Sequence, residues 1–234
     1  MKTRSVLTAL ILTAGLALGA STFAQPTTAA PTGKGAAPAA QPGADKGKKD
    51  EKKVETKAPK VGDVAPSFSL MDSDGKTVAL ESFKGKVVVI EWFNAECPFI
   101  VKHHVVNTTF NHLYEQFHSK NVEFVAICSS AKGKEGFGKE LNAAKKTEYK
   151  MQYPILLDES GATGHAYGAT NTPHCFVIGT DGKIAYAGAI DNNTDMKKAG
   201  DKNYVEMALN NILAGKAADP AQTKPYGCGV KYGN

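Results

Sequence analysis

The feature that most constrains the fold is an aliphatic run that is followed, seven residues after its end, by a Cys-Pro pair. Val87 to Ile90 is continuously apolar, which predicts a central strand over Lys86 to Trp92 that is buried on both faces. An irregular turn at 94–96 follows, then Cys97, then Pro98, and a helix tolerates proline best in its first turn. The pattern therefore places a single thiol between the carboxyl end of a strand and the amino end of a helix.

This position has a chemical consequence for the Cys97 thiol. The amino end of a helix carries about half a positive charge and free N–H groups, so it favours a thiolate. The thiolate is the nucleophilic form of cysteine. Glu96, which precedes the cysteine, opposes this effect by like charge. The stretch therefore predicts a reactive sulfur on a strand-to-helix turn.

Hydrophobic patterning predicts a mixed sheet around the central strand. Asp74-Gly75 and Asp181-Gly182 indicate hairpin turns. Strands are expected over 67–70, 77–80, 122–128, 154–157, 172–179 and 183–188, and helices over 99–117, 136–149, 163–167 and 204–213. This order predicts an α/β fold with both sheet faces covered, and a reactive group at the carboxyl ends of the parallel strands.

The first quarter of the chain has a different composition. Residues 1–24 combine a basic start, an apolar run and small residues, which indicates a secretory signal cleaved after Ala24; an uncleaved membrane anchor is the alternative. Residues 25–60 are rich in Ala, Pro, Gly and Lys and are expected to be a disordered linker. One domain over 61–215 and a tail over 216–234 follow. We therefore expect a periplasmic or secreted protein with no membrane span in its mature chain.

The formal net charge of +5 belongs to the signal and the linker. From Val61 onward the chain has 18 Lys, no Arg and 19 Asp and Glu, a formal charge of −1. A nucleic-acid partner is therefore not predicted. Arg4 is the one arginine of the whole chain.

Four segments of the chain together resemble a known family. They read VGDVAPSFSLMDSDGKTVALESFKGK, then ECPF, then YGATNTPHCFVIGTDGKIAYAGAID, and finally TKPYGCGVKY. Over Val61 to Tyr232 the chain is similar to thioredoxin-fold redoxins of the alkyl hydroperoxide reductase/thiol-specific antioxidant superfamily, and among them to peroxiredoxin-like thioredoxin family proteins. The resemblance implies a thioredoxin-like fold: a central mixed β-sheet flanked by helices, with an N-terminal β-hairpin extension. It also implies that Pro173 follows a cis peptide bond beside the Cys97 sulfur.

The chain departs from the family's motifs around Cys97. The second cysteine of C-x-x-C is Ile100 here, and a cysteine that many close relatives have three residues before Cys97 is Asn94. In P-x-x-x-T/S-x-x-C of true peroxiredoxins, the proline position is Ile90 and the Thr/Ser position is again Asn94. Those enzymes also use an arginine, for which lysine is a poor substitute. Fast peroxidase chemistry is therefore not expected, although Asn94 still offers one hydrogen-bond donor.

A second thiol for Cys97 has several candidates. Cys228 lies in a Gly-Cys-Gly segment of the tail, which would let it reach the site. Cys175 is two residues past Pro173 and thus on the same strand face. Cys128 ends an apolar strand and is expected to be buried. Four cysteines allow three full pairings, and an exported protein permits disulfides, so the choice stays open.

Other polar residues near Cys97 have a functional and a structural interpretation. Glu91 in the central strand is either an acid that moves protons beneath the cysteine or a residue facing polar surroundings. His103 and His104 are not expected to contact the sulfur, because position 104 lies two helical turns from Cys97. One of them is expected to be solvated and the other to face the core. His174 follows Pro173 and would be placed to tune the thiol.

The sequence thus predicts an exported thiol oxidoreductase that needs no cofactor. Cys97 attacks a disulfide or a peroxide, and Cys228, Cys175 or an external thiol resolves the product. The partner is a thiol or disulfide protein, or a peroxide substrate. One alternative is a copper-binding, metallochaperone-like module, although Val101 replaces the second cysteine of its C-x-x-x-C motif. The other is a non-catalytic thioredoxin-fold interaction domain.

Overall fold

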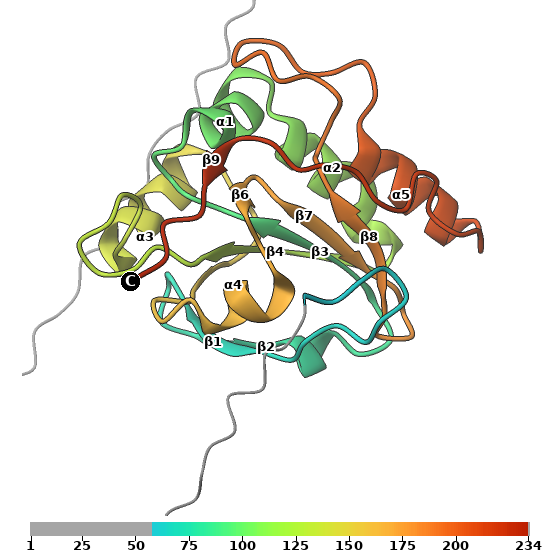
Figure 1. Cartoon of the computed structure of the whole chain (residues 1–234), viewed down its shortest axis with the longest axis horizontal. Coiled ribbons are helices and arrows are strands. Elements are labelled where there is room, and N and C mark those ends of the chain that lie inside the picture. Colours follow the sequence, from blue (N-terminus) through green and yellow to red (C-terminus); the bar gives the residue numbers. More distant parts are fainter. Residues whose placement is uncertain (1–57, 234) are drawn as a thin grey trace, which may run out of the picture. The chain divides into compact units, whose positions relative to one another are not determined.

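The computed structural model describes residues 58–233 (Figure 1). The predicted signal peptide and nearly all of the predicted linker lie outside this range. Within 58–233, no helix combines the length and apolarity that crossing a membrane requires.

A seven-stranded mixed sheet forms the centre of the fold, in the order β2-β1-β5-β4-β3-β7-β8. Its three middle strands, β5, β4 and β3, run parallel, and antiparallel pairs flank them on both sides. The strands are β1 (Ser69–Asp72), β2 (Thr77–Ala79), β3 (Val87–Trp92), β4 (Val122–Cys128), β5 (Ile155–Leu157), β7 (Cys175–Ile178) and β8 (Ile184–Gly188). All six residues of β3 are buried, as its apolar run predicts. The α/β class and the N-terminal hairpin of β1 and β2 are confirmed.

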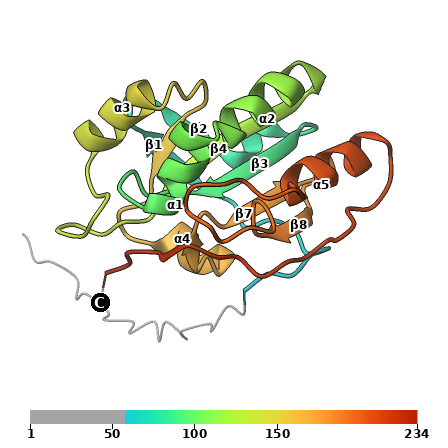
Figure 2. The same cartoon turned by 90° about the horizontal axis from the view of Figure 1, so that it is seen from above.

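Five α-helices cover the two faces of the sheet (Figures 1 and 2). They are α1 (Pro98–Val101), α2 (Thr109–Phe117), α3 (Lys139–Glu148), α4 (Ala162–Tyr167) and α5 (Tyr204–Leu213). Alternate β3 residues point to opposite faces. Val87 and Val89 join a core with residues of α1, α2 and α5, whereas Val88 and Ile90 join one with Tyr167 of α4. The two cores explain why β3 has no polar face.

The helix predicted after Pro98 is not continuous, so this expectation is wrong in part. It consists of α1, a π-helical turn over Lys102–Val106, and α2. The Asn107 N–H donates to the carbonyl of Lys102 five residues earlier, at 2.9 Å, which widens the turn. Thr108 then has a left-handed backbone with φ 49°, which ends the π-helical turn before α2 begins. The spacing of the apolar residues matches a single helix, but the backbone is interrupted at Asn107 and Thr108.

The C-terminal tail returns to the amino end of α1 (Figure 1). There β9 (Cys228–Gly229) pairs antiparallel with β6 (Asn171–Thr172), with Thr172 opposite Cys228. Two further hydrogen bonds continue this contact: Val230 N–H donates to Thr170 O at 3.1 Å, and Ala131 N–H donates to Lys231 O at 2.9 Å. The tail is thereby bound to the segment that precedes β7.

Candidate active site around Cys97

Cys97 is the N-cap residue of α1, and Pro98 begins the helix, as expected. The Cys97 carbonyl accepts hydrogen bonds from the N–H groups of Ile100 and Val101 at 2.9 and 3.0 Å. Its own N–H donates to Asn94 O at 3.0 Å, which closes the turn after β3. The side chain is fully buried. The thiol therefore lies at the predicted place, but other parts of the chain cover it.

Two groups from distant segments contact the Cys97 sulfur. The carbonyl oxygen of Thr172 lies 3.1 Å from it, within reach of the thiol proton. The peptide bond between Thr172 and Pro173 is cis, as the resemblance implies. The Cys228 sulfur lies 2.7 Å from the Cys97 sulfur. The structure thus brings Cys97, Cys228 and the residue before Pro173 together.

Backbone contacts of the tail fix the position of Cys228. The Asn171 side chain donates to Gly227 O at 3.0 Å. A Cβ at Gly227 would lie 2.2 Å from Thr172 O, and the φ of Gly227 is +112°, so this approach requires glycine. Burial, and then the adjacent Cys97 sulfur, raise the pKa of Cys228 to about 12. Cys228 therefore keeps its proton at neutral pH.

Asn94, expected as a hydrogen-bond donor at the site, makes hydrogen bonds with two backbone groups. Its Oδ1 accepts from the Glu96 N–H at 2.9 Å, and its Nδ2 donates to Glu135 O at 3.2 Å. The Glu96 carboxylate accepts from Gly136 N–H at 2.8 Å. These contacts connect the cysteine turn to the loop around Gly136.

The other two cysteines lie in buried strand positions. Cys175 is fully buried in β7, opposite Glu91 of β3, and burial raises the pKa of its thiol well above the ordinary value. Cys128 ends β4, donates to Gly136 O at 3.4 Å and also has a pKa raised by burial. Burial of Cys128 was expected. Of the two sulfurs considered as partners for Cys97, the structure brings Cys228 into contact.

The comparisons with known proteins agree with this fold. A family model described as Redoxin matches residues 60–205. The chain belongs to the redoxin family. The match ends before Cys228, so the second thiol of the contact lies beyond the part that the family model covers.

Curated relatives of this redoxin carry two kinds of name. The thiol-disulfide oxidoreductase ResA of Bacillus thuringiensis subsp. konkukian (strain 97-27) is 29% identical over 127 residues, which are 53% of this chain and 66% of that protein. The chloroplastic peroxiredoxin Q of Suaeda salsa is 30% identical over 131 residues, or 53% of this chain and 56% of that protein. The matched part thus spans less than two thirds of the length of either relative.

Solved structures share the fold of this redoxin. An uncharacterized conserved protein from Geobacillus kaustophilus is 28% identical with a TM-score of 0.64, over 74% of this chain and 93% of that one. A hypothetical protein, SMc02350, from Sinorhizobium meliloti 1021 has the same TM-score at 24% identity, over 76% of this chain and 97% of that one. These similarities establish the thioredoxin-like fold.

Both histidines after α1 are buried, which corrects the expectation that one would be solvated. His104 Nε2 lies 2.9 and 3.1 Å from the two carboxylate oxygens of Glu91, which is itself buried. The Tyr153 hydroxyl donates to the same carboxylate at 3.4 Å. His103 faces a second polar cluster. The π-helical turn explains the correction, because it directs consecutive side chains to two separate buried partners.

The second polar cluster was not predicted from the redoxin's sequence. Lys102 and His103 of the π-helical turn meet Asp191, after β8, and Tyr226 of the tail. Burial lowers the pKa of Lys102, and Asp191 opposes that shift. Burial lowers the pKa of His103 to about 3. The partners are separated by about 90 and 120 residues, and no local pattern signals such a contact.

His174 lies in an apolar environment beside the cis bond. Its ring packs against Phe176, with centroids 4.5 Å apart, and its Nδ1 accepts from the Thr170 N–H at 3.4 Å. Burial lowers the pKa of His174 to about 4. It is therefore neutral at physiological pH, and its contacts are with the loop rather than with the sulfur.

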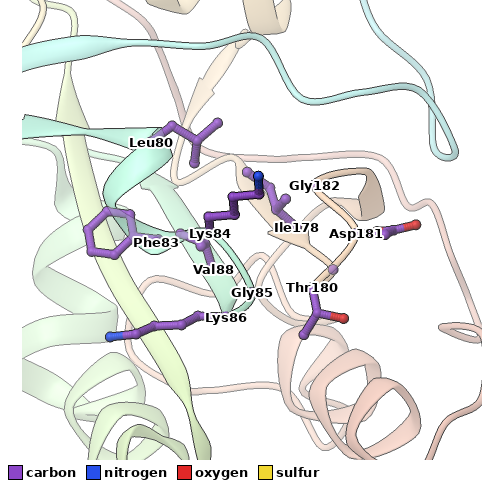
Figure 3. Close-up of a pocket in the computed structure, with 11 residues that line it drawn as sticks. Leu80, Phe83, Lys84, Gly85, Lys86, Val88, Ile178, Thr180, Asp181 and Gly182 are labelled. Carbon is purple, nitrogen blue, oxygen red and sulfur yellow. The ribbon is translucent and has the colours of Figure 1, made fainter.

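A separate pocket of about 180 Å³ lies at the opposite end of β3 (Figure 3). Leu80, Phe83 and the 84–86 turn line one side of it, and the Ile178–Gly182 hairpin turn lines the other. Since Cys97 follows the carboxyl end of β3, this pocket is remote from the thiol pair. Over residues 58–233, no three His, Cys, Asp or Glu side chains are grouped as metal ligands.

Proposed function

We propose that this redoxin is a thiol-disulfide oxidoreductase in which Cys97 is the nucleophile and Cys228 is the resolving thiol. The observation that carries the proposal is the 2.7 Å separation of their sulfur atoms, beside the carbonyl that precedes a cis-proline. The match to the redoxin family and the name of the ResA relative support the same class of reaction.

The reaction transfers two electrons to a substrate disulfide. The Cys97 thiolate attacks one substrate sulfur, forms a mixed disulfide and releases the other sulfur as a thiolate. Cys228 then gives up its proton and attacks the Cys97 sulfur. The Cys97–Cys228 disulfide forms, and the second substrate thiol leaves. The substrate is reduced to two thiols, and the protein is oxidised by the same two electrons.

A peroxide substrate is the second route, supported by the peroxiredoxin Q relative. There Cys97 takes one peroxide oxygen to form a sulfenic acid and releases an alcohol or water. Cys228 condenses with the sulfenic acid, and water leaves. The lack of arginine after Arg4 favours the disulfide route.

Access to the sulfur requires movement of the tail. Cys97 is fully buried, and Cys228 and Thr172 lie against its sulfur. We propose that the Gly227–Gly229 segment leaves β6 before a substrate reaches Cys97. If the sulfur stays covered, the non-catalytic interaction domain is the better description of this chain.

The proposed cellular location rests on the sequence alone. Residues 1–24 are proposed as a signal peptide, 25–60 as a linker, 61–215 as the redoxin domain and 216–234 as its tail. The protein would then act in the periplasm or outside the cell. The N-terminal peptide of the mature protein, identified by mass spectrometry after cell fractionation, tests this: a chain that still begins at Met1 contradicts it.

The thiol assignment is tested by oxidising the reduced protein with glutathione disulfide or with a hydroperoxide. We expect a Cys97–Cys228 peptide in the mass spectrum of the wild type. Cys97→Ser should abolish all turnover, and Cys228→Ser should stop at a mixed disulfide with glutathione. Cys175→Ser, a change at another buried cysteine, is the matched control and should form the same cross-linked peptide. An unmodified Cys97 in the oxidised wild type rejects the proposal.

The copper-binding alternative needs a separate measurement. Titration of the reduced protein with copper(I), compared with Cys97→Ser, distinguishes a stoichiometric site from weak thiol binding. The metallochaperone hypothesis is favoured if copper(I) binds stoichiometrically, binding depends on Cys97, and the protein has no disulfide reductase activity.

A further inference from the structure

We propose that the cluster of buried Lys102, His103 and Asp191 with the half-buried Tyr226, here named the tail anchor, is a positioning device that holds Cys228 on Cys97. The inference deepens the proposed function and rests on it for the role of Cys228. Tyr226 is the key member, because it is the one group of the four that the tail supplies.

The tail anchor joins three segments of the chain. Lys102 and His103 come from the π-helical turn directly after α1, Asp191 follows β8, and Tyr226 lies two residues before Cys228. The side chains of Lys102, His103 and Asp191 are at most 2% exposed. Burial of charged groups is costly unless each has a partner, so these contacts are needed.

The hydrogen bonds around the Tyr226 hydroxyl form a complete set. The hydroxyl donates to Asp191 Oδ1. It accepts from Lys102 Nζ at 3.2 Å, and its second lone pair faces His103 Nε2 at 2.9 Å. A tyrosine hydroxyl has one donor and two acceptor sites, so all three are used. This requires the proton of neutral His103 on Nε2, and its Nδ1 then accepts from Thr109 Oγ1 at 3.1 Å.

Other groups of the fold meet further members of the anchor. Lys102 Nζ donates to Asn193 O at 2.5 Å and lies 3.7 Å from Asp191 Oδ1. The second Asp191 oxygen accepts from the Gly200 N–H at 2.6 Å. No apolar residue at position 226 would satisfy Lys102, His103 and Asp191 at once. The hydrogen bonds of the Tyr226 hydroxyl therefore fix the position of this part of the tail.

The anchor transmits this position to the sulfur through one residue. Between Tyr226 and Cys228 lies Gly227, which is pressed against Thr172 O and receives the Asn171 hydrogen bond. The Tyr226 ring also packs on Phe99 of α1, with centroids 5.6 Å apart. With its neighbours fixed on both sides, Cys228 has a high effective concentration at Cys97, as in other intramolecular reactions of preorganised groups.

The test is Tyr226→Phe, which removes the hydroxyl and keeps the ring. Reduced protein is equilibrated with reduced and oxidised glutathione, and the Cys97–Cys228 disulfide is quantified by mass spectrometry. We expect the equilibrium constant for disulfide formation to fall about tenfold, which raises the reduction potential by about 30 mV. In reduced protein, alkylation of Cys97 by iodoacetamide should become about tenfold faster, because the tail leaves β6 more often.

Two variants make the result specific. Tyr114→Phe removes a hydroxyl from α2, where the ring packs near Phe124 and Tyr153, and should change neither quantity. Asp191→Asn keeps the size and an acceptor but removes the charge, and should shift both in the same direction as Tyr226→Phe. If Tyr226→Phe does not unfold cooperatively, Asp191→Asn serves as the test variant in its place.

The outcomes separate this inference from the proposed function. If Tyr226→Phe and Asp191→Asn change neither the equilibrium constant of the disulfide nor the rate of Cys97 alkylation, the anchor is overturned, even where the wild type forms the disulfide. A wild type without the disulfide refutes the role of Cys228. Faster Cys97 alkylation in the two variants would then still support the anchor as the device that covers the sulfur.

Discussion

At the scale of single residues, the Cys97–Cys228 pair has an asymmetry that suits exchange chemistry. The pKa of Cys228 is raised to about 12 by burial and by the neighbouring sulfur, so Cys228 holds its proton at neutral pH. Cys97, in contrast, is the N-cap residue of α1 and lies 3.1 Å from the Thr172 carbonyl oxygen. The two thiols therefore lie in different environments although they touch.

Asn94 offers a residue-scale prediction about the cysteine turn. Asn94→Ala removes the acceptor of the Glu96 N–H and the donor to Glu135 O, two hydrogen bonds to exposed residues. Each hydrogen bond contributes about 0.5–1.5 kcal/mol net of its exchange with water, so the free energy of unfolding should fall by about 1–3 kcal/mol. Urea unfolding measures it. Asn210→Ala, at an exposed position of α5, is the control and should change stability by less than about 0.5 kcal/mol.

The sequence predicts some of these residues better than others, for a physical reason. Cys97 lies in a local pattern, a strand-to-helix turn, which is visible in the chain, whereas the place of Pro173 beside it is implied by the family resemblance. The contact of Tyr226 with Lys102 and Asp191 depends on how distant segments pack. Lys102 in particular is a charged residue that composition assigns to the surface, and only its partners explain its burial.

At the scale of elements, the helices show that the spacing of apolar residues does not fix where a helix ends. The segment after Pro98 has the apolar spacing of one helix, yet the helix is broken by the π-helical turn and by Thr108.

The end of α3 is regular. Met151 N–H donates to Lys146 O at 2.9 Å and Lys150 N–H donates to Thr147 O at 3.1 Å, which is the Schellman arrangement. It places Lys150 at φ 55°.

Lys150→Gly should therefore stabilise the protein. Glycine adopts a positive φ without the steric cost that a lysine Cβ has there, and Lys150 is exposed, with no packing to lose. We expect the free energy of unfolding to rise by about 0.5–1 kcal/mol, measured in urea. Glu148→Gly, two residues earlier in the helix, should lower it by about 1 kcal/mol. A loss of stability in Lys150→Gly would contradict the left-handed cap.

At the scale of the whole molecule, the described part of the chain closes on itself through its tail. The tail crosses from α5 to α1, pairs with β6 and ends beside the loop at Ala131 (Figure 1). The redoxin match ends at residue 205, so the tail lies beyond the part of the chain that the family model covers. The sequence predicts the domain from its strand order and offers Cys228 as one of several partners for Cys97, but the tail has no hydrophobic periodicity from which its path could be predicted.

The stability of the whole molecule should depend on pH through His174. Its pKa is about 4 in the folded state against an ordinary value of 6.5, because burial disfavours the charged ring. The unfolded chain thus binds a proton below pH 6.5 that the folded chain does not bind until about pH 4. The contribution of neutral His174 to the free energy of unfolding is fully present above pH 6.5. It is lost as pH falls toward 4, and the free energy of unfolding changes by about 1.4 kcal/mol per pH unit in this range.

His174→Asn isolates this contribution, because its side-chain oxygen keeps an acceptor for the Thr170 N–H. Lost packing on Phe176 should lower its stability at every pH, so the slope between pH 6.5 and 4 is the informative quantity. We expect that slope to be shallower than in the wild type by about 1.4 kcal/mol per pH unit, measured by urea unfolding at each pH. His112→Asn, an exposed change on α2, should leave the slope as it is. Equal slopes in wild type and His174→Asn would mean that water reaches the ring in the folded state, and that the loop before β7 opens more readily than its hydrogen bonds with the tail indicate.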